Sequence, residues 1–157
     1  MFALTKKTDY ALIALCHMAQ HPEELCTARD MAGRYNMPTA LVMNVLKTLN
    51  HSKIIRSIRG AKGGYTLAMP AEQITLSDII IIVEGPVRFV QCAAGARSTT
   101  ANCGLADSCP VTKAVNRVHE ELNDFLKQVT LERIAYGEEY GNGNRECLRL
   151  GVAANSE

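Results

Sequence analysis

The sequence predicts a mainly α-helical protein with one small β-hairpin and a long helix towards its C-terminal end. Apolar residues recur at helical spacing in three segments of the first 52 residues. Two β-prone runs then flank a glycine-rich turn at 60–64, and a later apolar series between 111 and 129 advances in steps of four and three. A chain of 157 residues has room for one small domain with an appendage.

Three helices are expected in the first 52 residues. The first runs from Asp9 to about Gln20 and is capped by Thr8. A second begins at Thr27, where an acid three residues later makes a weak capping box, and a third runs from Thr39 to about residue 52. The expected inward positions are Ala11, Leu12, Leu15, Ala19, Ala28, Met31, Ala32, Tyr35, Val42, Val45, Leu46 and Leu49. The second and third helices, joined by a tight turn, form a helix-turn-helix unit.

The segment after the third helix predicts a β-hairpin with runs at 54–59 and 65–68. A hairpin in this place is a wing, so residues 1–69 are interpreted as a winged helix-turn-helix domain. Arg59 and Lys62 lie at its glycine-rich tip, which favours close approach to a polyanion. A plain surface hairpin is the alternative interpretation.

The rest of the chain divides into three predicted parts. Residues 70–109 hold a short connecting helix from about Leu76 and a loop rich in small residues. Residues 110–136 form a long helix, and 137–157, rich in Gly, Asn and Glu, form a mobile tail. The apolar seam of the long helix consists of Val111, Val115, Val118, Leu122, Phe125 and Val129. This coiled-coil spacing favours pairing with a second copy, although the helix could instead lie on its own small domain.

Charge is distributed unevenly along a chain whose net charge is +1. Residues 1–69 carry nine Lys/Arg and four Asp/Glu, whereas 70–157 carry eight and twelve. A basic N-terminal half suits an anionic partner such as the phosphates of nucleic acid, with chance unevenness as the alternative.

No apolar run approaches the roughly 20 residues of a membrane helix, and no signal core is present, so we expect a cytoplasmic protein without a membrane partner. No catalytic triad, phosphate loop or paired-carboxylate site appears, which argues against an enzyme.

Three of the six cysteines, Cys92, Cys103 and Cys109, lie within one 18-residue stretch. Thiols in the cytosol are normally reduced, so this clustering indicates metal or redox chemistry rather than disulfides. Gaps of ten and five residues differ from the close pairs of a zinc ribbon. Thiolates on a loop of small residues suit an iron–sulfur cluster, with three unrelated thiols as the alternative.

Three runs, at 4–12, 58–67 and 74–79, resemble the IscR/NsrR family of winged-helix iron–sulfur transcription regulators. The resemblance covers roughly residues 2–136 and includes the three cysteines, although the first gap between them is longer than in the commonest family pattern. It implies a regulator, expected to be a repressor, that binds a palindromic double-stranded DNA operator as a homodimer. It also implies a 2Fe–2S or 4Fe–4S cluster that senses redox state, nitric oxide or iron.

The expected DNA contacts come from the third helix in the major groove, the wing beside the minor groove, and helix starts near phosphates. These residues are Thr5, Lys6, Thr27, Arg29, Thr39, Ala40, Met43, Asn44, Lys47, Arg59 and Lys62. Arg59 is placed at the minor groove by the resemblance.

The resemblance also leaves one position of the cluster to be filled. Thr112 and Tyr35 occupy positions where some family members carry a ligating histidine, and neither is a good ligand. Asp9 matches a carboxylate that the nitric-oxide-sensing branch offers across the dimer interface, so it joins the three cysteines as a candidate ligand. The alternative is that Asp9 only interacts with the positive end of its helix, which contributes about 0.3–1 kcal/mol. His119, a small-molecule thiol or water are further candidates.

Two other functions stay open at the level of the sequence. A regulator of the same fold could work without a cluster, through thiol oxidation or a protein partner, as in relatives that control cysteine metabolism. An iron–sulfur carrier or redox protein that contains a winged helix is the alternative from another class.

Overall fold

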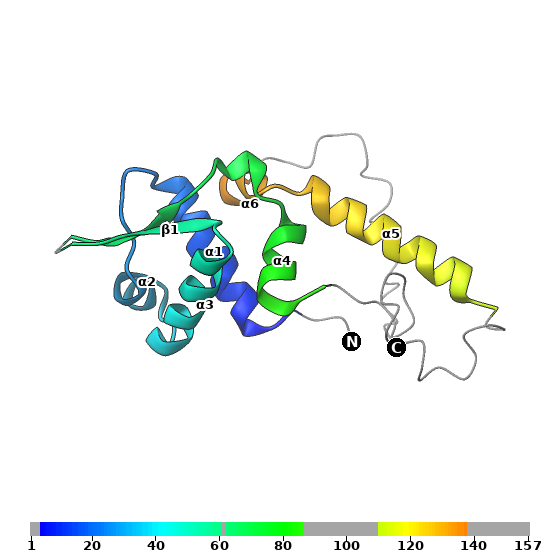
Figure 1. Cartoon of the computed structure of the whole chain (residues 1–157), viewed down its shortest axis with the longest axis horizontal. Coiled ribbons are helices and arrows are strands. Elements are labelled where there is room, and N and C mark those ends of the chain that lie inside the picture. Colours follow the sequence, from blue (N-terminus) through cyan, green and yellow to red (C-terminus); the bar gives the residue numbers. More distant parts are fainter. Residues whose placement is uncertain (1–3, 61, 87–109, 138–157) are drawn as a thin grey trace, which may run out of the picture.

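The computed structural model describes residues 4–60, 62–86 and 110–137 and confirms the expected class, mainly helical with one antiparallel hairpin. The helices and the hairpin pack into one body from which α5 projects (Figure 1). The elements are α1 (Lys6–Gln20), α2 (Ala28–Tyr35), α3 (Thr39–His51), β1 (Ile55–Ile58), β2 (Gly64–Leu67), η1 (Ala71–Gln73), α4 (Leu76–Glu84), α5 (Thr112–Gln128) and α6 (Leu131–Tyr136). Within this described part of the chain, no helix is long and apolar enough to cross a membrane.

The first helix begins three residues earlier than the sequence predicts. Thr5, not Thr8, is the N-cap, and its hydroxyl accepts a hydrogen bond from the Lys7 N–H at 3.2 Å. The Thr8 side chain is fully buried and donates instead to Glu84 of α4 at 2.6 Å. Both threonines could act as caps, and the choice between them depends on the contact with α4, which no local pattern reveals.

The helix-turn-helix forms as predicted. Thr27 and Asp30 make a reciprocal capping box at the start of α2, and Asn36 ends that helix in the left-handed conformation. Helix α3 then presents its predicted apolar face to α1 and α2. The core of the molecule is centred on Leu15, Met18, Met31, Leu46, Leu49, Ile55, Ile79 and Leu131, each at most 1% exposed.

The wing is held to the body of the domain by a backbone pairing that the sequence does not reveal. Ile55 pairs with Leu67 in the hairpin. On the other side of β2, the N–H groups of Tyr65 and Cys26 donate to each other's carbonyls at 2.9 and 3.0 Å. The segment before α2 therefore acts as a third, very short strand that fixes the base of the wing.

The predicted single helix at 110–136 is two helices. Helix α5 ends at Gln128, and Thr130 caps the separate helix α6. Across this break the Leu76 N–H donates to the Val129 carbonyl at 2.8 Å, and the Leu131 N–H donates to the Ile74 carbonyl at 2.7 Å. These bonds tie the break to the segment before α4, and α6 returns to pack on α1.

Candidate nucleic-acid interface and sensor region

The outward face of α3 consists of exposed side chains opposite its buried apolar face. Helical spacing brings Ala40, Met43, Asn44 and Lys47 together on this face, with Thr39 at the helix start. Met43 keeps 43% of its surface exposed, which is high for a large apolar side chain. All five residues that the sequence assigns to DNA reading on this helix therefore lie on the surface.

The helix-start threonines are engaged within the protein. The Thr5 hydroxyl contacts Glu84 as well as capping α1, and the Thr27 hydroxyl donates to the Asp30 carboxylate at 2.6 Å. These hydrogen bonds hold the starts of α1 and α2. The neighbouring cations, Lys6 and Arg29, are exposed.

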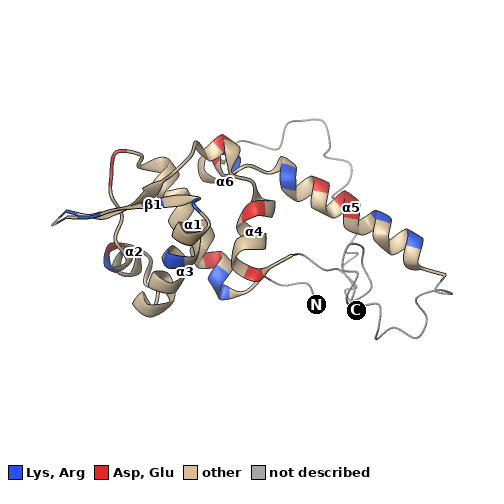
Figure 2. Ribbon diagram, viewed as in Figure 1, with Lys and Arg blue, Asp and Glu red and all other residues tan. Residues whose placement is uncertain are grey.

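The wing carries the exposed cations Arg59 and Lys62 on either side of its turn. Gly60 adopts φ +134°, which an L side chain rarely reaches, and a Cβ at Gly63 would clash with the Ile58 carbonyl. The turn that presents the two cations therefore depends on these glycines. Figure 2 shows Lys and Arg on the hairpin, on α2 and α3, and at the start of α1.

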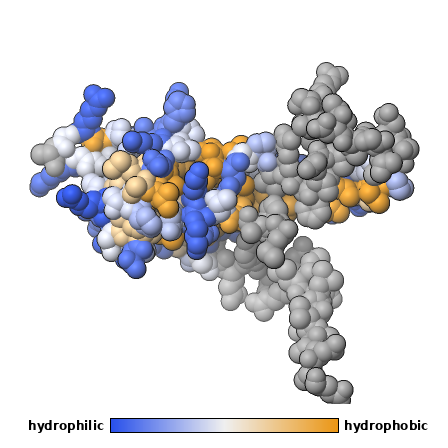
Figure 3. Space-filling model, turned by 90° about the horizontal axis from the view of Figure 1, so that it is seen from below, coloured by the Kyte–Doolittle hydropathy of each residue, from blue (hydrophilic) through white to orange (hydrophobic). Residues whose placement is uncertain are grey.

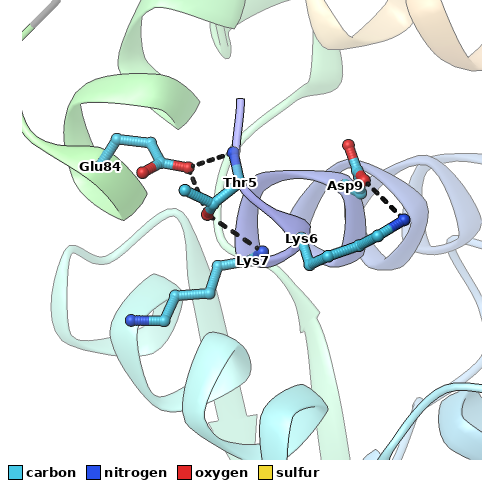
Figure 4. A network of polar contacts seen from close by, with 5 residues as sticks. All are labelled: Thr5, Lys6, Lys7, Asp9 and Glu84. Carbon is cyan, nitrogen blue, oxygen red and sulfur yellow. Dashed lines mark hydrogen bonds and ion pairs between the residues drawn. The ribbon is translucent and has the colours of Figure 1, made fainter. Parts of the chain in front are cut away.

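Glu84, the last residue of α4, is bonded to the first turn of α1 (Figure 4). Its Oε1 accepts the Thr5 N–H at 2.9 Å, the Thr5 hydroxyl at 2.5 Å and the Thr8 hydroxyl at 2.6 Å. These hydrogen bonds, with a smaller contribution from Lys7, lower the pKa of the Glu84 carboxyl below its ordinary value. The contact joins the end of α4 to the start of the helix that carries Thr5, Lys6 and Asp9.

Asp9 lies in the first turn of α1, and its exposed carboxylate pairs with Lys6 at 3.6 Å. It takes no part in the bonds to Glu84 and points away from them (Figure 4). The carboxylate is thus available to a ligand or to a second subunit. Its position is equally that of an acid interacting with the positive end of a helix.

The predicted cluster ligands Cys92, Cys103 and Cys109 lie outside the described residues. Among the residues that the structure does describe, no group of three Cys, His, Asp or Glu could hold a metal ion. Burial raises the pKa of the Cys16 and Cys26 thiols, which suits packing rather than ligation. Three thiolates are the type of donor that an iron–sulfur cluster takes.

The candidate ligand His119 has defined surroundings, as do Tyr35 and Thr112 at the two positions where some family members carry a histidine. The Tyr35 hydroxyl is 3.0 Å from Nδ1 of the buried His17, so it is engaged in holding α2 to α1. His119 on α5 is 8% exposed. Its Nε2 lies 3.0 Å from the Asn123 amide, while its Nδ1 has no hydrogen-bond partner among the residues that the structure describes. Thr112 is the first residue of α5.

The seam residues of α5 differ in exposure. Val111, Val118 and Phe125 expose 56%, 46% and 49% of their surfaces, and Val115 and Leu122 are half-buried. In the space-filling view, apolar surface lies along the end of the molecule that α5 forms, away from the hydrophilic wing end (Figure 3). Val129 is different, because it is 1% exposed and belongs to the core of its own chain.

Two features of this region were not predicted from the sequence. The role of Glu84 had no signal beyond its place at the end of a predicted helix, because its partners are 76 and 79 residues away. The end of α5 did have a signal, since Thr130 followed by an acid is a typical helix start. The continuing seam spacing concealed it.

The fold and this surface define a winged-helix DNA-binding protein. The family model described as "Iron-dependent Transcriptional regulator", Rrf2, matches residues 4–137. The chain therefore belongs to the Rrf2 family of DNA-binding transcription regulators.

Individual relatives agree with this assignment. A protein of Neisseria meningitidis serogroup A, whose name describes an HTH-type transcriptional regulator, is 27% identical over 90% of this chain and 93% of its own. Among solved structures, CymR, the global cysteine regulator of B. subtilis, is 25% identical, covering 87% of this chain and 98% of its own, with a TM-score of 0.69. The T. potens IscR structure is also 25% identical, covering 88% and 89%, with a TM-score of 0.65.

Proposed function

We propose that this regulator is a homodimeric repressor whose operator binding is controlled by an iron–sulfur cluster held by Cys92, Cys103 and Cys109. The observation that carries the proposal is the place of these cysteines in the sequence: they lie between α4, which Glu84 bonds to the DNA-binding domain, and α5, which carries the exposed seam. When bound, the cluster would supply a group that reacts with oxidants or nitric oxide. The family description as iron-dependent supports this choice.

Operator binding would use three parts of the described surface. Helix α3 would enter the major groove with its exposed face, and the wing would place Arg59 and Lys62 at the neighbouring minor groove and phosphates. Lys6 and Arg29, at the starts of α1 and α2, would contact phosphates. The basic N-terminal half of the chain supports this orientation, because each of these elements carries Lys or Arg, although α5 carries some as well (Figure 2).

Control would pass through Glu84. Cys92 follows Glu84 by only eight residues, so binding of a cluster by the cysteines would act close to the end of α4. Glu84 in turn fixes the N-cap of α1 through Thr5 and Thr8. A change in the loop would therefore alter how firmly the first turn of α1, with its phosphate-contacting Lys6, is held.

The dimer would form through the exposed seam of α5. Val111, Val118 and Phe125 recur every seven residues, as the a or d positions of a coiled coil do. A symmetric pair would bury this face and fix the spacing of two DNA-reading units, which matches a palindromic operator. Val129 is left out of this interface because its own chain already buries it.

Asp9 is the proposed fourth ligand, offered from the partner subunit. A carboxylate is a harder and weaker partner for cluster iron than a thiolate, so a signal molecule could displace it. The test is Asp9→Asn, purified without oxygen, with Asp124→Asn on α5 as the matched control. Loss of cluster stability in the first variant alone would support ligation. Identical spectra and decay rates for both variants would reduce Asp9 to a helix-start residue.

A second candidate function is a cluster-free regulator controlled by thiol oxidation or a protein partner. The similarity to a structure named as a global cysteine regulator favours this alternative. Anaerobic purification followed by visible absorbance and resonance Raman spectroscopy separates the two. The proposal expects a coloured protein with iron–sulfur vibrations that disappear in a Cys103→Ser variant. A colourless protein that contains no iron or sulfide would favour the alternative.

A further inference from the structure

We propose that α3 selects A·T base pairs, with Met43 and Ala40 against thymine methyl groups and Asn44 against adenine. This inference deepens the DNA-binding function and rests on α3 being the helix that enters the major groove. It names the kind of half-site that the regulator recognises.

The composition of the exposed face of α3 favours A·T base pairs. Recognition helices contact base edges mainly through residues near their N-terminal end. In α3 this end presents the apolar Ala40 and Met43, together with Asn44 and Thr39. The helix contains no arginine and no acid, and its one Lys/Arg/Asp/Glu residue is Lys47, further along the helix.

The chemistry of the base edges favours the same pairs. Guanine offers two acceptors that favour Arg or Lys, and cytosine offers a donor that favours Asp or Glu. Thymine alone places a methyl group in the major groove, and adenine matches the paired donor and acceptor of an Asn amide. The face of α3 therefore lacks the usual partners of G·C pairs near its start and carries those of A·T pairs.

Met43 and Asn44 are both exposed on this face of α3. Met43 leaves 43% of its surface in contact with water, although Met is usually buried. The Asn44 side chain is also exposed, while its backbone carbonyl accepts the Thr48 hydroxyl at 3.0 Å. Met43 and Asn44 are neighbours on one face of α3, so a thymine and an adenine at adjacent steps could be read together.

The experiment begins with the full-length protein purified without oxygen and selection of its site from random duplexes at fixed salt. An A·T block is expected in each half-site. Deoxyuridine is then placed at single thymines, which removes only the methyl group. Affinity should fall about 4-fold at a contacted thymine, the equivalent of one buried methyl group. Replacing the contacted adenine by 7-deazaadenine should lower affinity about 10-fold.

Variants assign these effects to side chains. Met43→Ala should bind the thymine and deoxyuridine duplexes equally at the thymine assigned to Met43 and keep the difference at the thymine assigned to Ala40. Asn44→Ala should no longer distinguish adenine from 7-deazaadenine. Lys47→Ala is the control on the same helix: it should weaken all duplexes alike and reduce the dependence of affinity on salt.

Two results would overturn the inference, and they differ from a failure of the function itself. Specific binding to a site whose half-sites are G·C in the α3 contact region would refute A·T reading while leaving a DNA-binding regulator. Unchanged affinity for every deoxyuridine and 7-deazaadenine duplex would do the same. Absence of any sequence-specific binding, with and without a cluster, would overturn the regulator as well.

Discussion

A single carboxylate oxygen of Glu84 accepts three hydrogen bonds from Thr5 and Thr8. These bonds make the stability of the folded protein depend on pH. The bonds favour the ionised carboxylate, so the pKa of Glu84 is lower in the folded protein than in the unfolded chain. The resulting stabilisation is present above the unfolded pKa and is lost as pH falls through the folded one.

Glu84→Gln tests this role because it keeps the shape of the side chain and removes its charge. The variant should have a lower Tm than wild type at pH 7, and the difference should shrink as pH falls below about 4, where an unperturbed glutamate is protonated. Thermal unfolding followed by circular dichroism between pH 7 and 3.5 measures this. Glu72→Gln in η1 is the control; a Tm difference independent of pH would contradict the assignment.

His17 affects the pH dependence of stability in the same direction as Glu84, although here the neutral form is favoured. Burial first, and then the nearby His21 and Arg34, lower the pKa of its imidazole, although Glu24 acts weakly against them. The folded protein thus resists protonation, and its stability should fall as pH drops below the unfolded value of about 6.5. Tyr35, 3.0 Å from Nδ1, is the hydrogen-bond partner of the neutral ring.

His17→Asn should therefore flatten the dependence of stability on pH between 7.5 and 5.5, because asparagine does not titrate. Urea unfolding at a series of pH values gives the slope for each variant. His51→Asn, on the exposed end of α3, is the matched substitution for comparison. An unchanged slope in His17→Asn would show that this histidine does not govern the acid response.

At the scale of elements, the wing depends on both its turn and its base. Arg59→Ala should weaken operator binding by roughly 10-fold, since a groove contact contributes about 1–3 kcal/mol. Circular dichroism and light scattering should match wild type, because Arg59 is exposed. Arg56→Ala on β1 serves as the comparison, and fluorescence anisotropy at fixed salt is the measurement. Equal operator affinity in Arg59→Ala and wild type would exclude the wing from the interface.

The sequence predicted the helix-turn-helix well because its signals are local. The capping box of Thr27 and Asp30 and the 3.6-residue period of α3 act within a few residues. Tyr35 was expected to point inward but is 39% exposed. Two other errors arose where distant contacts decide. Thr8 does not cap α1 because its hydroxyl donates to Glu84. The apolar seam does not include Val129 because the backbone there pairs with the segment before α4.

The candidate site follows the same division. The exposed face of α3 and the tip of the wing could be predicted from the sequence. The apolar residues there follow a clear pattern, and the residues outside that pattern are the exposed ones. The engagement of the Thr5 and Thr27 hydroxyls could not be predicted in full, because Thr5 reaches across 79 residues to Glu84. Spacing alone also assigned Val129 to the same seam as Val118, although only Val118 is exposed.

At the scale of the whole molecule, the projecting α5 predicts an assembly. Val118→Glu places a charge on the most central of the exposed seam positions and should convert the dimer to monomers, with loss of operator binding. Leu122→Glu should do the same, but Leu122 is half-buried and the fold must be checked. Gln128→Glu adds the same charge off the seam. Light scattering at micromolar concentration measures the oligomeric state of each variant. If Val118→Glu is still a dimer, the seam of α5 is not the dimer interface.

The central claim is that cluster state sets DNA affinity, and anaerobic operator titration of the same preparation with and without its cluster tests it most directly. The cluster is removed by nitric oxide or a chelator, and the Cys103→Ser variant provides a protein that never held it. The account predicts a visible absorbance that is lost on treatment and a change in operator affinity of about 10-fold or more, the coupling of a few kcal/mol typical of an allosteric switch. Equal operator affinity in the loaded, stripped and Cys103→Ser proteins would contradict it.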